Sequence, residues 1–162
     1  MVIDILEHYE PETLRFFILS THYRSPLDFS DERLAEAQRS LSRLKTAQEN
    51  LQALMALMNA GLTEESLKLR RKVLELRNEF MEAMRDDFNT ALAISHMFAL
   101  AKEINIYHQS IASVGSKPDG KLVSILQVFS LKCVLLLEYW NQLKVLLKLK
   151  LRFGRTTDGN AY

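Results

Sequence analysis

The sequence has few of the residues that many kinds of functional site require. Its 162 residues include one Cys, five Gly and three Pro. A single Cys excludes a disulfide framework and a multi-cysteine zinc site, and it suits a reducing compartment. So few Gly and Pro leave little room for glycine-rich phosphate loops or disordered linkers. Neither GxxxxGK[ST] nor GxGxxG occurs.

Strong net charge and long apolar runs are also missing. The 21 Lys and Arg nearly balance the 20 Asp and Glu, so the net charge of +1 excludes a protein that coats nucleic acid by charge alone. The sequence contains no run of about 18 uncharged apolar residues, which is the length that a membrane-spanning helix needs. The first residues, Met1–Glu7, have no basic flank typical of a secretory signal. We therefore expect a soluble cytoplasmic protein without a membrane partner.

The positive charge that is present gathers late in the chain. Residues 91–162 hold nine basic and four acidic side chains, and almost all of the excess follows Lys121. This asymmetry indicates an anionic partner for the C-terminal end, or lysines that keep a very apolar helix in solution. Both interpretations remain open on charge alone.

Apolar periodicity predicts helices. Apolar residues three or four apart run from Leu34 to Met58, with Ser30 or Asp31 as the cap and Gly61 as the stop. A second helix begins at Thr63, and a third begins at Asn89 or Thr90. The second helix is expected to bury an apolar face made of Leu67, Leu74, Met81, Met84 and Phe88. Val73, Leu76 and Phe80 lie beside this face and make it wider. The third is expected to bury Ala93, Met97, Leu100, Ile104, Tyr107 and Ile111.

The rest of the chain completes an all-α pattern. Pro11 starts a short helix that runs to Ser20, and residues 21–29 lack a helical period. Residues 113–120 predict a loop, and a Leu-rich helix follows from Leu122 to about residue 150. The tail, residues 154–162, is expected to be disordered. We predict an antiparallel bundle of four to five helices.

A search for catalytic chemistry yields no candidate catalytic, cofactor-binding or metal-ligating residue. The four His residues lie far apart, and none is spaced with Cys133 as metal ligands are. Cys133 is most simply a small residue of the core. Asp86 and Asp87 are explained as cap and dipole partners of the start of the next helix. An enzyme would need a charged pocket between helices, and the sequence does not decide whether one exists.

Two kinds of segment could bind an anion. Lys and Arg cluster at residues 39–45, 68–72 and 144–152, where a solvated helix face is the simpler interpretation. The irregular segment His22-Tyr23-Arg24 combines aromatic and basic side chains, and irregular segments often carry function. The alternative is that Tyr23 and Phe29 only fix this loop onto the bundle.

Two blocks of sequence resemble bacterial cysteinyl-tRNA synthetases. The first runs from Ile5 to Ser30 and includes EPETLRFFILSTHYRSPLDFS. The second is DDFNTAL, residues 86–92, followed by Phe98 and AKEIN, residues 101–105. Their order and separation match the family, and the resemblance extends to about Phe129.

This resemblance implies a function. In the family, the first block follows the KMSKS loop of the catalytic domain and leads into a helical DALR domain, an anticodon-binding-type bundle of class I synthetases that helps to hold tRNA. Residues 1–30 are then a connector and residues 31–153 the bundle. The resemblance implies a tRNA partner, tRNA-Cys, and a chain that is catalytically incomplete alone, since ATP and zinc bind to the family's catalytic domain. Candidate tRNA contacts are His22, Arg24, Arg70, Arg71, Lys148 and Arg152.

The resemblance fades in the last quarter of the chain. The family continues there into a charged helix and an anticodon-reading element, whereas residues 131–151 are Leu-rich and hold one acid, Glu138. This departure leaves a second interpretation open. The bundle could dock onto a synthetase catalytic partner or onto itself, because a lone bundle would hardly cover so apolar a helix.

Overall fold

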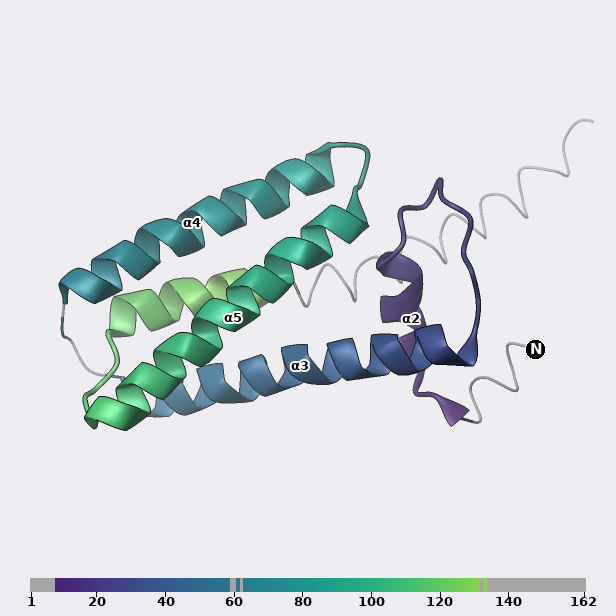
Figure 1. The fold of residues 1–162 in the computed structure, drawn as a ribbon. Coiled ribbons are helices and arrows are strands. Elements are labelled where there is room, and N and C mark those ends of the chain that lie inside the picture. Colours follow the sequence, from purple (N-terminus) through teal and green to yellow (C-terminus); the bar gives the residue numbers. More distant parts are fainter. Residues whose placement is uncertain (1–7, 59–60, 62, 132, 134–162) are drawn as a thin grey trace, which may run out of the picture. The chain divides into compact units, whose positions relative to one another are not determined.

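The computed structural model describes residues 8–58, 61, 63–131 and 133. The chain divides into two compact units, Met1–Ser130 and Leu131–Tyr162. The first unit contains α2 (Pro11–Leu19), α3 (Asp31–Ala56), α4 (Glu64–Arg85) and α5 (Thr90–Val114). Residues 120–131 are also helical. The fold is all-α, as predicted, and α5 packs against both α3 and α4 (Figure 1).

The helices begin where the sequence predicted. Ser30 accepts a hydrogen bond from the backbone N–H of Arg33 at 3.3 Å, and Asn89 accepts one from the N–H of Leu92 at 3.1 Å. Thr63 and Ser66 form a reciprocal capping box at the start of α4. These side chains satisfy backbone donors that have no partner within the helix.

The predicted stop at Gly61 is wrong. Helix α3 ends at Ala56 with Leu57 as its C-cap, before Gly61 is reached. Helix α5 does end on a glycine, because Gly115 takes the left-handed conformation with φ of 65°. A residue without Cβ reaches this conformation without steric cost, and this is why glycine commonly follows a helix.

The apolar face predicted for α4 is only partly correct. Leu67 and Leu74 are exposed, and Phe88 lies beyond the helix and is also exposed. The residues that had been expected merely to widen the face form its centre: the buried side chains are Ser66, Val73, Leu76, Phe80, Ala83 and Met84. Apolar residues occur on two neighbouring stripes of α4, and the position of α5 and of residues 120–131 decides which stripe is covered.

The predicted faces of α3 and α5 agree more closely with the structure. Helix α5 buries Ala93, Met97, Leu100, Ile104 and Tyr107, whereas the predicted Ile111 is only half-buried. Helix α3 buries Leu34, Ala37, Leu41, Ala47, Leu51 and Leu54. Of the predicted stripe, Leu44 and Met55 are half-buried and Met58 is exposed. Phe80 of α4 and Phe129 pack edge to face with ring centroids 5.6 Å apart, and both are almost fully buried.

Short helix α2 attaches the N-terminal part of the chain to the bundle. Pro11 occupies its first turn, and α2 packs on α3. Phe16 meets Phe98 of α5 edge to face at 6.2 Å, and Phe17 meets Phe29 at 5.4 Å. These contacts hold the irregular segment 21–29 at both of its ends.

Several predictions fall on residues outside the described ones. These are the course of the Leu-rich helix beyond residue 133, the tail 154–162 and the candidate contacts Lys148 and Arg152. None of the helices in the described part is long and apolar enough to cross a membrane.

Candidate nucleic-acid interface

The segment His22-Tyr23-Arg24 forms an ordered aromatic and cationic stack. The rings of His22 and Tyr23 are stacked, with centroids 4.9 Å apart and planes 24° from parallel. The Arg24 guanidinium carbon lies 5.3 Å from the Tyr23 ring centroid, within the range of a cation–π contact. The Arg24 backbone N–H donates to His22 Nδ1 at 3.3 Å. We call these three residues and their partner Asp87 the Arg24 cluster.

Asp87 links this stack to the turn between α4 and α5. Its Oδ2 lies 2.7 Å from Arg24 Nη2 and accepts a hydrogen bond from the Tyr23 hydroxyl at 2.6 Å. Arg24 Nε donates to the Tyr23 hydroxyl oxygen at 2.9 Å. The hydrogen bond to Asp87 raises the pKa of Tyr23, and the hydrogen bond with Tyr23 raises the pKa of Arg24. The guanidinium therefore remains charged.

The backbone of the turn presents the Asp87 carboxylate. Asp86 is the C-cap of α4, and Asp87 and Phe88 have φ of 51° and 54°. The Asn89 N–H then closes the turn by donating to the carbonyl of Ala83 at 3.0 Å. Aspartate tolerates the left-handed conformation better than most residues. Asp87 is not the cap of α5, because Asn89 caps that helix and Asp87 pairs with Arg24.

The Arg24 cluster joins the two blocks that resemble a synthetase. Tyr23 and Asp87 are 64 residues apart in sequence. Sequence reasoning selected His22 and Arg24, and it offered Tyr23 and Phe29 as residues that fix the loop onto the bundle. Tyr23 does so through its hydrogen bond to Asp87, and Phe29 through its contact with Phe17. The role of Asp87 as the partner of Tyr23 and Arg24 was missed. No periodicity could have revealed this pairing, although the two blocks already suggested that both segments matter. The cluster faces solvent, with the Arg24 side chain 70% exposed.

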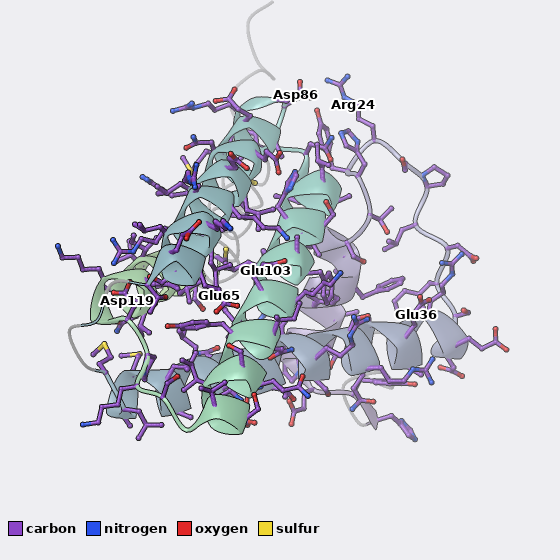
Figure 2. The ribbon with its side chains drawn as sticks, turned by 60° about the vertical axis from the view of Figure 1, so that its left-hand side comes forward. Arg24, Glu36, Glu65, Asp86, Glu103 and Asp119 are labelled. Carbon is purple, nitrogen blue, oxygen red and sulfur yellow. The ribbon has the colours of Figure 1, made fainter. Side chains whose placement is uncertain are left out.

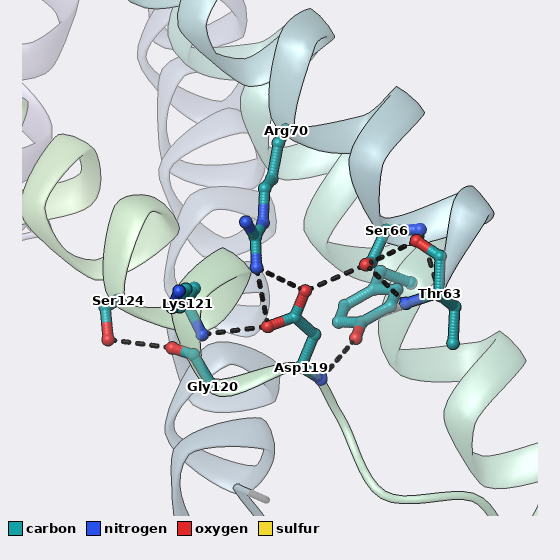
Figure 3. A network of polar contacts seen from close by, with 8 residues as sticks. Thr63, Ser66, Arg70, Asp119, Gly120, Lys121 and Ser124 are labelled. Carbon is teal, nitrogen blue, oxygen red and sulfur yellow. Dashed lines mark hydrogen bonds and ion pairs between the residues drawn. The ribbon is translucent and has the colours of Figure 1, made fainter. Parts of the chain in front are cut away.

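Arg70 lies in a different, buried network. It forms two hydrogen bonds to Asp119, at 2.8 and 2.6 Å, and Ser66 donates to the same carboxylate at 2.8 Å (Figure 3). The backbone N–H of Asp119 donates to the Tyr107 hydroxyl oxygen at 2.9 Å. Burial raises the pKa of Asp119, but the hydrogen bonds from Ser66, Arg70 and the Lys121 backbone outweigh it and lower the pKa overall.

The cations of α4 are mostly committed to acidic neighbours. Lys68 pairs with Glu64 and Lys72 pairs with Glu103, while Arg70 is held by Asp119. Within the described part of the chain, Arg71 is the member of this cluster that makes no ion pair, and its side chain is exposed. Arg71 is therefore available to an anion such as phosphate, whereas Arg70 is held inside the fold by Asp119.

The two groups of candidate contacts lie at opposite halves of α4. Each helical residue rises about 1.5 Å, so Arg70 lies roughly 22 Å along the axis from Arg85, at the end next to the Arg24 cluster. Figure 2 shows Arg24 and Asp86 near one end of α4, with Glu65 and, beside the helix, Asp119 toward the other end. The structure brings His22 and Arg24 together but does not add Arg70 to them.

The described residues also include a shallow hollow and a buried thiol. The hollow, of about 270 Å³, is lined by Leu74, Arg77, Ser124, Ile125, Val128 and Phe129, a mainly apolar set with one charged member. Burial raises the pKa of Cys133 to about 12, so this thiol is not poised as a nucleophile. Among the described residues, no group of three or more His, Cys, Asp or Glu could hold a metal ion.

Comparison with known families agrees with this architecture. Residues 79–131 match the DALR domain, and residues 1–39 match the catalytic domain of class I (C) tRNA synthetases. The second match includes the whole segment that we expected to be a connector. The helical bundle thus contains a domain of the DALR class.

Several curated proteins named cysteine–tRNA ligase are similar in sequence to this chain. The protein of Desulforamulus reducens is 43% identical over 134 residues, which are 78% of this chain and 26% of that protein. The protein of Shouchella clausii is 49% identical over 105 residues, 64% of this chain and 22% of that protein. The chain is similar to one part of these cysteine–tRNA ligases, and it spans about a quarter of the length of these curated relatives.

Proposed function

We propose that this chain is a tRNA-binding helical domain of the cysteine–tRNA ligase type, with tRNA-Cys as its partner in the cytoplasm. The observation that carries the proposal is the Arg24 cluster, an exposed cation held over the Tyr23 ring where the two family-related blocks meet. The DALR match and the names of the relatives support it. ATP and zinc chemistry is left to a catalytic domain, so the chain is catalytically incomplete alone.

The chemistry of the cluster favours contact with the RNA backbone. A guanidinium offers several N–H donors that match the geometry of a phosphate group. Such contacts position RNA without reading its sequence, and RNA helices are recognised mostly through shape, phosphates and 2′-hydroxyls. Arg71 adds a second phosphate contact at the far half of α4.

Titration of a tRNA-Cys transcript at several salt concentrations tests the proposal. Each neutralised phosphate contributes about 0.7 to 0.9 to the slope of log affinity against log salt. We expect binding at low salt that weakens steeply as salt is raised. Binding that is independent of salt, or no binding at low salt, contradicts the proposal.

Arg24→Ala separates the cluster from general charge. It should weaken binding and reduce the salt slope by about 0.7 to 0.9, the contribution of one phosphate. Lys68→Ala is the matched control, because it removes the same charge from an exposed cation at the other end of α4. If the two variants lose the same affinity, general charge accounts for the binding and the cluster does not.

A further inference from the structure

Two edges of the Arg24 side chain have different environments. The guanidinium has five N–H donors. Two of its nitrogens are in use: Nε donates to the Tyr23 hydroxyl oxygen and Nη2 pairs with Asp87. Nη1 and the remaining Nη2 hydrogen lie on the outer edge of a side chain that is 70% exposed. The inner edge is therefore held and the outer edge is open to an anion.

We infer that Tyr23 and Asp87 are positioning residues, which hold Arg24 so that its outer edge can receive a phosphate group of RNA through two hydrogen bonds. The inference rests on the proposed function and extends it to two residues that themselves need not touch the RNA. Asp87 Oδ2 accepts a hydrogen bond from the Tyr23 hydroxyl and forms an ion pair with Arg24 Nη2, and the Tyr23 ring lies under the guanidinium.

Holding Arg24 in place before RNA arrives makes the binding free energy more favourable. A free arginine has many rotamers, and its immobilisation on a ligand costs free energy. A guanidinium already fixed by Asp87 and Tyr23 has lost most of this freedom when RNA arrives. Asp87 also repels phosphate, so positioning and simple electrostatics predict opposite effects when its charge is removed.

Asp87→Asn is the decisive variant. Asparagine suits the left-handed backbone and keeps an oxygen that can accept from Tyr23, but it removes the charge that fixes Arg24. We expect RNA affinity to fall roughly twofold to tenfold, the range for ordering one long side chain on binding. Simple electrostatics instead predicts tighter binding, because a negative charge has been removed.

Asp86→Asn is the matched control. It makes the same charge change one residue away, and the Asp86 side chain makes no hydrogen bond or ion pair with the described residues. Its affinity should equal or slightly exceed that of the wild type. Tyr23→Phe keeps the ring and the net charge but removes the hydroxyl, so it should weaken binding in the same direction as Asp87→Asn.

A double-variant cycle identifies Arg24 as the residue through which Asp87 acts. In the Arg24→Ala background, Asp87→Asn should no longer weaken binding. Thermal unfolding should be nearly unchanged in each single variant, because the cluster is exposed, and this excludes misfolding as the cause. Side-chain Nε–H NMR of the RNA-free protein should show Arg24 more mobile in Asp87→Asn than in the wild type.

The outcomes separate this inference from the proposed function. Absence of RNA binding by the wild type overturns the proposed function and the inference with it. If the wild type binds RNA, the inference fails when Asp87→Asn binds as well as Asp86→Asn, or when its loss persists without Arg24. In that case tRNA binding itself stands, and Asp87 is only a neighbouring anion.

Discussion

At the scale of single residues, Asp119 has the most demanding environment among the described carboxylates. Its side chain is 5% exposed, and it accepts hydrogen bonds from Arg70, Ser66 and the Lys121 backbone. A buried ion pair costs desolvation free energy, but the removal of one partner leaves the other charge without compensation. The pair therefore matters most when it is broken.

Asp119→Asn should destabilise the protein by about 3 kcal/mol at neutral pH, because it leaves the Arg70 guanidinium buried without a carboxylate. Urea unfolding followed by circular dichroism measures this loss. Asp86→Asn, which changes an exposed carboxylate, should leave the unfolding free energy nearly unchanged. An equal effect of both variants would show that the Asp119 network contributes nothing specific.

The pKa of Asp119 sets the pH window of this contribution. Because the folded protein lowers the pKa below the ordinary value of 3.8, the ionised form is stabilised by folding. The contribution is fully present well above pH 3.8 and is lost as pH falls through the lower, folded pKa. The difference in unfolding free energy between wild type and Asp119→Asn should therefore shrink as the pH is lowered below this value. A difference that is constant down to pH 2 contradicts this.

Sequence reasoning treated Arg70 and Arg71 as one basic cluster, and the structure separates them. Successive residues on a helix point about 100° apart, so neighbours can have opposite environments. Arg70 meets Asp119, which is 49 residues away and lies on a loop, whereas Arg71 faces solvent. The residue types were visible in the sequence, but a partner at this separation depends on tertiary structure.

At the scale of helices and turns, Gly115 shows where backbone geometry dictates the residue. It ends α5 with φ of 65°, and its surroundings leave space for a Cβ atom. Gly115→Ala should cost about 1 kcal/mol through backbone strain alone. Gly61→Ala is the matched control, since Gly61 also has open space but no positive φ, so it should be neutral or slightly stabilising. Thermal unfolding distinguishes the two, and equal effects would contradict the role of φ.

Local signals predicted element boundaries better than element faces. Ser30, Thr63 and Asn89 cap helices through hydrogen bonds to residues three positions away, so the sequence contains all the information that is needed. The buried face of α4 depends instead on which neighbours cover it, and Leu67 and Leu74 are exposed despite their spacing. The pairing of Asp87 with Tyr23 escaped prediction because Tyr23 follows a different helix.

At the scale of the whole bundle, the two family-related blocks depend on each other through the fold. Residues 21–29 reach the α4–α5 turn through the Arg24 cluster, and α2 reaches α5 through the contact of Phe16 with Phe98. The sequence resemblance located both blocks, but not their meeting point. The DALR match begins at residue 79 and includes Asp87, while the match to the catalytic domain includes Arg24. The proposed RNA contact thus lies where the two matched segments meet.

Core packing behind this meeting point provides the last prediction. Phe80 is 2% exposed and contacts Phe129, so Phe80→Ala should cost about 3–5 kcal/mol. Domains of this kind have only about 5–15 kcal/mol of stability, so the variant should unfold at much lower urea concentration. Phe80→Leu keeps most of the volume and should cost less than about 1.5 kcal/mol.

RNA binding by Phe80→Leu and Phe80→Ala tests whether RNA binding at the Arg24 cluster depends on the core only through the folded fraction of the protein. Phe80 lies one turn before the end of α4, and the Asn89 N–H ties the α4–α5 turn back to Ala83. Phe80→Leu should therefore bind tRNA like the wild type, while binding by Phe80→Ala should fall in proportion to its folded fraction. A loss by Phe80→Leu without a matching loss of stability would mean that core packing adjusts the turn that presents Asp87. Core and interface would then be coupled rather than independent.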